Sequence, residues 1–224
     1  MSDPREQTLD WRSTRSAVLE TLQEMDRSGL TTGTAGNVSA RAPDGRVVLS
    51  PTALSYSEMQ LDDLVVTELS GEIVAGHRVP TSEIDLHLAC LRQHPEIGAV
   101  VHTHAIHASM FAVAGQPIPC VLEEFELYIG GDVLVAAYHP TGTVALGEAA
   151  ADLVHDRAAV LLANHGLVVV GHTPGEALQL TRLVERAARI IWGARLLGDP
   201  PPLPETSREA LAANYLARRR TPRV

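Results

Sequence analysis

The sequence predicts an α/β protein whose β-sheet is mixed or antiparallel and is covered by helices. Two observations lead to this prediction. Amphipathic helical segments alternate with short apolar strands along the chain, and some of the strands are joined by hairpin turns rather than by helices. With 224 residues, 45% of them hydrophobic and 20% charged, the chain can bury a sizeable core.

The helices are predicted from apolar residues at helical spacing together with start or stop signals. In the first helix Val18 and Met25 share one face, and Gly29 is a natural stop. The last long helix has a capping box made by Thr173 and Glu176. The predicted helices are residues 11–27, 81–93, 107–114, 143–155 and 173 to about 197.

The strands are predicted from short apolar or β-branched runs bounded by turn residues. Asp44-Gly45 leads into one strand, Ser70-Gly71 joins two strands as a hairpin, and Asn164-His165-Gly166 divides the final run. The predicted strands are residues 46–50, 64–69, 72–74, 98–104, 133–138 and 159–170, the last range holding two strands. A proline-rich break, DPPPLP, divides the chain into a domain over residues 1–198 and a helical tail over residues 199–224.

Charge and composition exclude several classes of function. A net charge of −9 argues against binding to the phosphate backbone of nucleic acids, and no apolar run is long enough for a transmembrane helix. The polar N-terminal segment is unlike a secretory signal, and Cys90 and Cys120 are too few for a disulfide framework. We therefore expect a cytoplasmic protein with reduced thiols that binds neither nucleic acid nor membrane.

The absence of lysine is the most decisive exclusion, because all 18 basic residues are arginines. A guanidinium group cannot form a Schiff base, so a Schiff-base lysine mechanism and lysine-tethered pyridoxal phosphate are excluded. A Walker-type phosphate loop is also excluded, because it requires a lysine that contacts the phosphates. The ten histidines direct attention instead to metal binding or to imidazole acid–base chemistry.

Three histidines form a candidate metal site. His102 and His104 project from one face of a predicted strand, although a half-exposed strand can also carry two such residues by chance. His165 lies at a turn between two strands, where it can reach a neighbouring strand or can be an ordinary turn residue. If the three meet, they leave an open coordination position, as in catalytic zinc sites.

Two further segments are candidates for binding or catalysis. The predicted helix start at Pro80 can hold an anion, and Glu83 there either complements the helix dipole or acts as a carboxylate beside a metal. His87, one turn later, is either a supporting partner or an ordinary surface histidine. The glycine-rich loop over residues 32–39 can approach a phosphate, but it is not a dinucleotide-binding fingerprint.

Taken together, these segments resemble the class II aldolase/adducin family, and within it the bacterial fuculose-phosphate aldolases. The resemblance covers roughly residues 11–200, and five blocks in the right order are more specific than any one of them. The blocks are GTAGNVSAR over residues 33–41, SPTALSY over 50–56, PTSE over 80–83, HTHAIH over 102–107 and NHG over 164–166.

The resemblance implies a three-layer α/β/α fold around a mixed, largely antiparallel sheet, and a cyclic homotetramer with active sites between subunits. It implies a divalent metal, usually Zn2+. The implied metal ligands are His102, His104 and His165, the implied acid/base residue is Glu83, and the implied phosphate-binding residues are Asn37, Thr52, Thr81 and Ser82. Related 4-epimerases carry aspartate where Glu83 stands, which favours an aldolase.

The chain departs from the family pattern at one position and is irregular at others. Members of the family often have glycine after the threonine of the second block, whereas this chain has Ala53, whose methyl group can crowd a phosphate. Glu124 and Tyr215 are candidates for groups that an adjacent subunit contributes. Their ordinary alternatives are a solvated acidic face for Glu124 and a residue that packs the tail helix down for Tyr215.

The sequence thus supports a metal-dependent aldolase. It would cleave a ketose 1-phosphate similar to L-fuculose 1-phosphate into dihydroxyacetone phosphate and a small aldehyde, through a metal-stabilised enediolate. One alternative is a dehydratase of the same family that acts on a substrate similar to methylthioribulose 1-phosphate. Others are a non-catalytic adducin-like interaction module, against which the intact histidines and Glu83 argue, and a structural histidine-rich domain.

Overall fold

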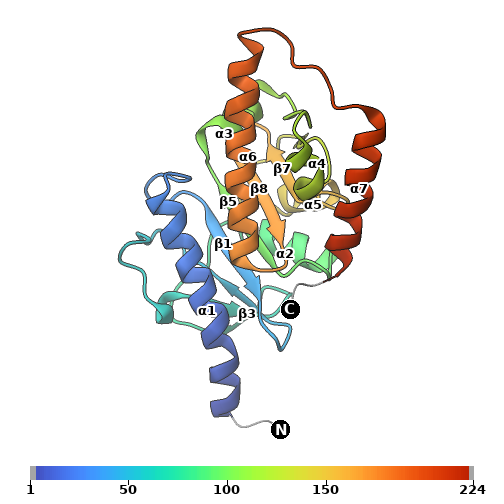
Figure 1. Ribbon diagram of the computed structural model, residues 1–224. Helices are drawn as coiled ribbons and strands as arrows, with labels where there is room; N and C mark the ends of the chain where they lie inside the picture. The colour runs from blue at the N-terminus through green and yellow to red at the C-terminus, as the bar shows by residue number, and fades with distance from the viewer. Residues whose placement is uncertain (1–3, 222–224) are drawn as a thin grey trace.

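A computed structural model of the chain describes residues 4–221, with side chains from residue 11 onward. Figure 1 shows helices on both faces of a central sheet, which confirms the three-layer α/β/α fold. The helices are α1 (Pro4–Arg27), α2 (Ile84–Gln93), α3 (Ile106–Ala114), α4 (Glu123–Ile129), α5 (Val144–Leu153), α6 (Pro174–Arg195) and α7 (Glu205–Arg220), with a short 3-10 helix, η1, at Leu61–Asp63. Among the described residues, no helix is both long and apolar enough to cross a membrane.

The sheet has eight strands in the order β4-β3-β2-β1-β5-β8-β7-β6. The strands are β1 (Asn37–Arg41), β2 (Val47–Leu49), β3 (Val65–Thr67), β4 (Ile73–Ala75), β5 (Ala99–Thr103), β6 (Leu134–Ala136), β7 (Ala159–Leu162) and β8 (Gly166–Gly171). The pairing of β6 with β7 is parallel, and the other neighbouring strands are antiparallel. The sheet is therefore mixed and largely antiparallel, as predicted.

A separate hydrophobic core lies on each face of the sheet. Successive residues of a strand point to opposite faces, so Val101 packs in the core covered by α1, α3, α4 and α6, while Val100 packs in the core covered by α2 and α5. Both side chains are fully buried, as are most residues of the central strands. Helices on both faces explain why these strands are continuous apolar runs rather than alternating ones.

The glycine-rich loop predicted over residues 32–39 is shorter than expected, because β1 begins at Asn37. The segment has few strong strand-forming residues, but it pairs with β2 on one side and with β5 on the other. Asn37 lies directly opposite His102 in this pairing. Pairing with the neighbouring strands therefore makes this segment a strand, although the intrinsic β-propensity of its residues does not predict one.

The helix predicted from residue 81 begins three residues later, at Ile84. The backbone N–H of Thr81 donates to the carbonyl of Ser50 at 2.9 Å, and Pro51 and Pro80 form an isolated antiparallel bridge. These contacts hold the start of the segment in an extended, strand-like pairing. Glu83 consequently occupies the position directly before the first helical residue.

The predicted tail helix is α7, which lies against α4 (Figure 1). Arg219 fastens its C-terminal half. Its guanidinium donates to the carboxylate of Glu96, to the backbone carbonyls of Val154 and Arg157, and to the hydroxyl of Tyr215. The tail therefore packs on the rest of the chain through several segments, and its treatment as a separate unit from residue 199 stays a prediction.

We expect Arg219→Leu to lower the free energy of unfolding by about 2–3 kcal/mol, because it leaves a carboxylate and two carbonyls without their donor. Arg220→Leu is the matched control, since Arg220 is exposed at the next position of the same helix. Urea denaturation of both variants measures the difference. Equal stabilities of the two variants would contradict the role assigned to Arg219.

Candidate metal centre and active site

Three histidines from two neighbouring segments converge on one point. His102 lies in β5, His104 directly follows it, and His165 lies in the turn between β7 and β8. The ring centroids are 4.7–5.0 Å apart, and one nitrogen from each ring lies within 4.8 Å of the others. The structure therefore brings together the three imidazoles that the sequence analysis selected.

The position of His165 depends on an unusual turn. Asn164 has a φ of +57°, a left-handed conformation that asparagine tolerates better than most residues. Gly166 then packs directly on the end of β5, where a Cβ atom would lie 2.5 Å from the carbonyl oxygen of Thr103 and 3.0 Å from Cδ2 of His104. The absence of a side chain at Gly166 lets the two strands approach closely at the histidines.

Glu83 enters the same site from the start of α2. Its Oε2 atom lies 3.2 Å from Nε2 of His102, and its Oε1 atom lies 3.5 Å from Nε2 of His165. The side-chain amide of Asn37 donates to Oε2 at 2.8 Å. The residue is only 5% exposed, so the carboxylate faces the imidazoles rather than solvent.

The protons of His102 can be placed from its contacts. Its Nδ1 atom lies 3.0 Å from the carbonyl oxygen of Leu167, which only accepts, so Nδ1 carries the proton. Burial lowers the pKa of His102 to about 3, and the ring is therefore neutral near pH 7. Its bare Nε2 atom faces Nε2 of His104 at 3.2 Å as well as the carboxylate of Glu83.

The donor set fits a divalent cation. One nitrogen of each imidazole and the carboxylate of Glu83 lie around a single point, and Nε2 of His102 carries no proton there. The Oε1 atom of Glu83 is buried and has no hydrogen-bond partner. Neutral imidazole nitrogens and a carboxylate oxygen are the ligands that Zn2+ prefers, and a cation would give this oxygen atom a partner.

Opposing effects set the ionisation of Glu83. Burial favours the neutral acid, but the hydrogen bond from the Asn37 amide favours the carboxylate, and the pKa of Glu83 lies below its ordinary value. The residue is therefore a carboxylate at neutral pH. A carboxylate in this place can ligate a metal, or it can accept a proton from a bound molecule and return it.

The phosphate-binding residues predicted from the resemblance fall into two groups. Thr52, Thr81 and Ser82 lie on two adjacent loops, because Pro51 pairs with Pro80 and the N–H of Thr52 donates to the carbonyl of Val79. Thr52 and Ser82 are exposed, while Thr81 is buried and its hydroxyl accepts from the N–H of Glu83. Asn37, in contrast, is 5% exposed, and its amide contacts Glu83 and His87.

Ala53 keeps the backbone shape of a glycine. Its φ is +55°, in the left-handed region that an alanine occupies at a cost of about 1–2 kcal/mol. The loop after Thr52 thus has a glycine-like path even though the glycine is absent. The methyl group is exposed rather than packed, so the surrounding loop tolerates it.

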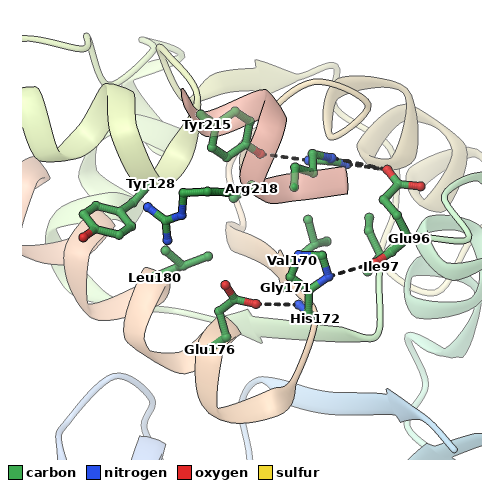
Figure 2. A pocket seen from close by; sticks show the side chains of 12 residues that line it. Glu96, Ile97, Tyr128, Val170, Gly171, His172, Glu176, Leu180, Tyr215 and Arg218 are labelled. Carbon is green, nitrogen blue, oxygen red and sulfur yellow. Dashed lines mark hydrogen bonds and ion pairs between the residues drawn. The ribbon is translucent and has the colours of Figure 1, made fainter. Parts of the chain in front are cut away.

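Glu124 and Tyr215 make contacts within the chain, and their contribution to a site of an adjacent subunit stays a prediction. Glu124 is half-buried on α4 and forms an ion pair with Arg186 of α6. Tyr215 is 6% exposed and packs α7 down. Figure 2 shows Tyr215 among the side chains that line a pocket, which Gly171 also lines. Gly171 ends β8, roughly 17 Å along the strand from the turn that carries His165.

The sequence agrees with a known family over most of its length. The model of the family "Class II Aldolase and Adducin N-terminal domain" matches residues 16–192.

The chain belongs to the class II aldolase and adducin family.

Individual relatives extend this similarity to nearly the whole chain. A 5-deoxy-D-ribulose 1-phosphate aldolase of Bacillus thuringiensis serovar kurstaki is 37% identical over 202 residues, which cover 90% of this chain and 94% of the relative. A 5-methylthioribulose-1-phosphate/5-deoxyribulose-1-phosphate aldolase of Rhodospirillum rubrum is 33% identical, with 90% of each chain covered. The solved structure of an L-fuculose 1-phosphate aldolase matches with a TM-score of 0.87 and 30% identity, covering 91% of this chain and 96% of that one.

Other residues of this member of the class II aldolase and adducin family support the site, although the sequence analysis gave them no role. Tyr56 is buried and donates to the carbonyl of Gly36, which fixes the loop before β1. Glu185 accepts from the backbone N–H groups of His107 and Ala108 and thus caps α3 just after the histidine strand. Tyr56 and His107 lie in the family blocks, and this was the only signal for them in the sequence.

We expect Gly166→Ala to lower the free energy of unfolding by about 2 kcal/mol, because the new methyl group would meet the backbone of Thr103. The variant should also bind Zn2+ more weakly, since the same methyl group crowds His104. Thermal unfolding and titration with Zn2+ measure the two effects.

The matched control for this variant is Gly193→Ala in α6, where a Cβ atom meets nothing within 4 Å. It should raise stability by up to about 1 kcal/mol, as alanine favours helix. Unchanged stability and Zn2+ affinity of Gly166→Ala would show that the close approach of the strands does not shape the site.

Proposed function

We propose that this chain is a metal-dependent aldolase that cleaves a ketose 1-phosphate into dihydroxyacetone phosphate and a small aldehyde. The observation that supports this most strongly is the convergence of His102, His104 and His165 with Glu83 on one point of a partly buried site. Because the chain has no lysine, a Schiff base cannot stabilise the charge that cleavage creates. Family membership agrees with the lyase activity.

The three histidines would hold the ion, and Zn2+ fits their chemistry. When bound, such an ion supplies Lewis-acid stabilisation for negative charge that develops on the substrate as its carbon–carbon bond breaks. The buried site is suited to this role, because electrostatic interactions are stronger where water is excluded.

Glu83 is proposed to move the proton at the reacting carbon. Cleavage breaks the bond between C3 and C4 of the ketose. The hydroxyl on C4 loses its proton as the aldehyde forms, and C3 must gain one to give dihydroxyacetone phosphate. The Oε1 atom of the Glu83 carboxylate is buried without a hydrogen-bond partner, so it would accept the proton that leaves the C4 hydroxyl and pass it to C3.

The two loops beside Glu83 are proposed to hold the phosphate. The exposed hydroxyls of Thr52 and Ser82 lie on these loops, and Ser82 precedes the N-terminus of α2, where the helix dipole favours an anion. Thr81 contributes its backbone to this arrangement, because its side chain already contacts Glu83. Binding energy from the remote phosphate would hold C3 near the carboxylate.

The names of the similar proteins support a ketose 1-phosphate as the substrate class. They comprise 5-deoxyribulose 1-phosphate, 5-methylthioribulose 1-phosphate and L-fuculose 1-phosphate aldolases. The sugars differ beyond the shared phosphate-bearing end. A screen of these three compounds therefore tests the class without assuming the aldehyde.

A dehydratase of a methylthioribulose 1-phosphate-like compound is the second candidate reaction. The relative from Rhodospirillum rubrum has 5-methylthioribulose 1-phosphate in its name, which favours that substrate but names an aldolase. The products separate the reactions, because an aldolase releases dihydroxyacetone phosphate whereas a dehydratase leaves the carbon chain intact. A protein that binds no metal and turns over none of these compounds would support an interaction module instead.

We also propose that the protein is a homotetramer. Large apolar side chains are exposed on the neighbouring helices α3 and α6, among them Ile106 (62%), Val113 (63%) and Trp192 (47%). Exposed apolar groups of this size commonly mark a protein interface. Light scattering coupled to gel filtration measures the mass, and a monomer at micromolar concentration would contradict this part of the proposal.

We expect His104→Ala to lose both bound metal and aldol cleavage, because one of three imidazole ligands is removed. His155→Ala is the matched control, since His155 is exposed on another part of the surface. Elemental analysis of the purified proteins and release of dihydroxyacetone phosphate are the measurements. Stoichiometric metal with full activity in His104→Ala would rule out the ligand assignment.

We expect Glu83→Gln to retain metal but to lower kcat by about 100-fold or more, because the amide cannot transfer a proton. Metal content and single-turnover cleavage rates distinguish this result from loss of the site. Wild-type kcat in this variant would remove the proposed role of Glu83.

A further inference from the structure

A row of three buried polar side chains lies behind Glu83. Asn37 and Ser39 project from β1, and His87 projects from α2 between them. His87 and Ser39 are fully buried and Asn37 is 5% exposed, so the row is closed to bulk water. This burial contradicts the alternative in which His87 is an ordinary surface histidine.

The contacts of this row permit one arrangement of protons in which every group is satisfied. The amide nitrogen of Asn37 donates to the carboxylate of Glu83 at 2.8 Å, which leaves its Oδ1 atom to accept from Nε2 of His87. His87 Nδ1 then lacks a proton and accepts from the hydroxyl of Ser39 at 2.8 Å. Burial lowers the pKa of His87 to about 4, consistent with a neutral ring.

We propose that His87 is a positioning residue for the active site, which acts by fixing the orientation of the Asn37 amide so that its nitrogen faces Glu83. If the amide were turned over, its oxygen would face a carboxylate oxygen at hydrogen-bond distance, and the two acceptors would repel. Glu83 would then turn away from His102, to which its Oε2 atom is now close. This inference rests on the proposed function, because it explains what orients Glu83, the carboxylate that is proposed to move the proton.

The same contacts give Asn37 a role besides the phosphate binding that the family resemblance implies. Its amide is engaged by Glu83 through nitrogen and by His87 through oxygen. The amide nitrogen has a second N–H, so a contact of Asn37 with a substrate phosphate stays a prediction. Within the protein, Asn37 links His87 to the carboxylate.

The test compares two substitutions of His87. His87→Gln keeps an N–H donor near the position of Nε2. His87→Leu introduces an apolar side chain of similar size that has no donor. We expect His87→Leu to lower kcat and Zn2+ affinity by about tenfold or more, as changes behind metal-site residues commonly do, with a smaller change in KM. His87→Gln should remain within about threefold of the wild type.

A control separates this effect from a general loss of stability. His94, at the end of the same helix, donates to the carbonyl of Ala151 at 2.8 Å, far from the row. His94→Leu should lower the melting temperature without changing kcat or Zn2+ affinity. Equal losses of activity in His87→Gln and His87→Leu, or none in His87→Leu, would overturn the proposal.

One measurement needs neither a variant nor a substrate. Nitrogen NMR of the histidine-labelled wild-type protein reports which ring nitrogen of His87 carries the proton, and the proposal requires Nε2. A proton on Nδ1 would overturn it even if every variant folded poorly. If the wild type cleaves no ketose 1-phosphate, the proposed function fails, while Zn2+ affinity and the position of this proton still decide the role of His87.

Discussion

The site depends on the convergence of three imidazole rings and one carboxylate on a single point. Nε2 of His102 faces a second imidazole and a carboxylate, and its own proton is held on the other side of the ring by the carbonyl of Leu167. Folding brings these groups together where water is partly excluded and where the Oε1 atom of Glu83 has no hydrogen-bond partner. A cation bound among them would supply the missing interaction, so the arrangement favours metal binding.

The order of strands in the sheet explains how distant segments contribute to this point. β1, β5 and β8 are neighbours, so Asn37 lies opposite His102, and His102 lies opposite Val168 of β8. The turn before β8 then carries His165 back over the end of β5, and α2 begins beside them. The rigid part of the fold therefore supplies the side chains that hold and orient the carboxylate, while loops supply the exposed hydroxyls.

Much of this could be predicted from the sequence, for identifiable reasons. Local patterns predict part of the site. Because alternate residues of a strand share one face, His102 and His104 are expected on the same side of the sheet, and the glycine after His165 indicates a turn there. The family blocks then supply the long-range pairing that local patterns lack. The role of His87 could not be settled, because its burial depends on β1, and β1 itself exists only through pairing with its neighbours. The placement of Tyr215 likewise followed from packing between α4 and α7, which no local pattern encodes.

The left-handed conformation of Ala53 bears on how proteins of this kind can be recognised. The loop keeps a left-handed backbone conformation at a position where glycine would be the most favourable residue. Its shape is therefore set by the main-chain torsion angles and not by the identity of that one residue. Searches that demand glycine there would pass over such chains. A search by backbone conformation would find them. It would also show how many residues of a binding loop can be substituted before the loop changes its conformation.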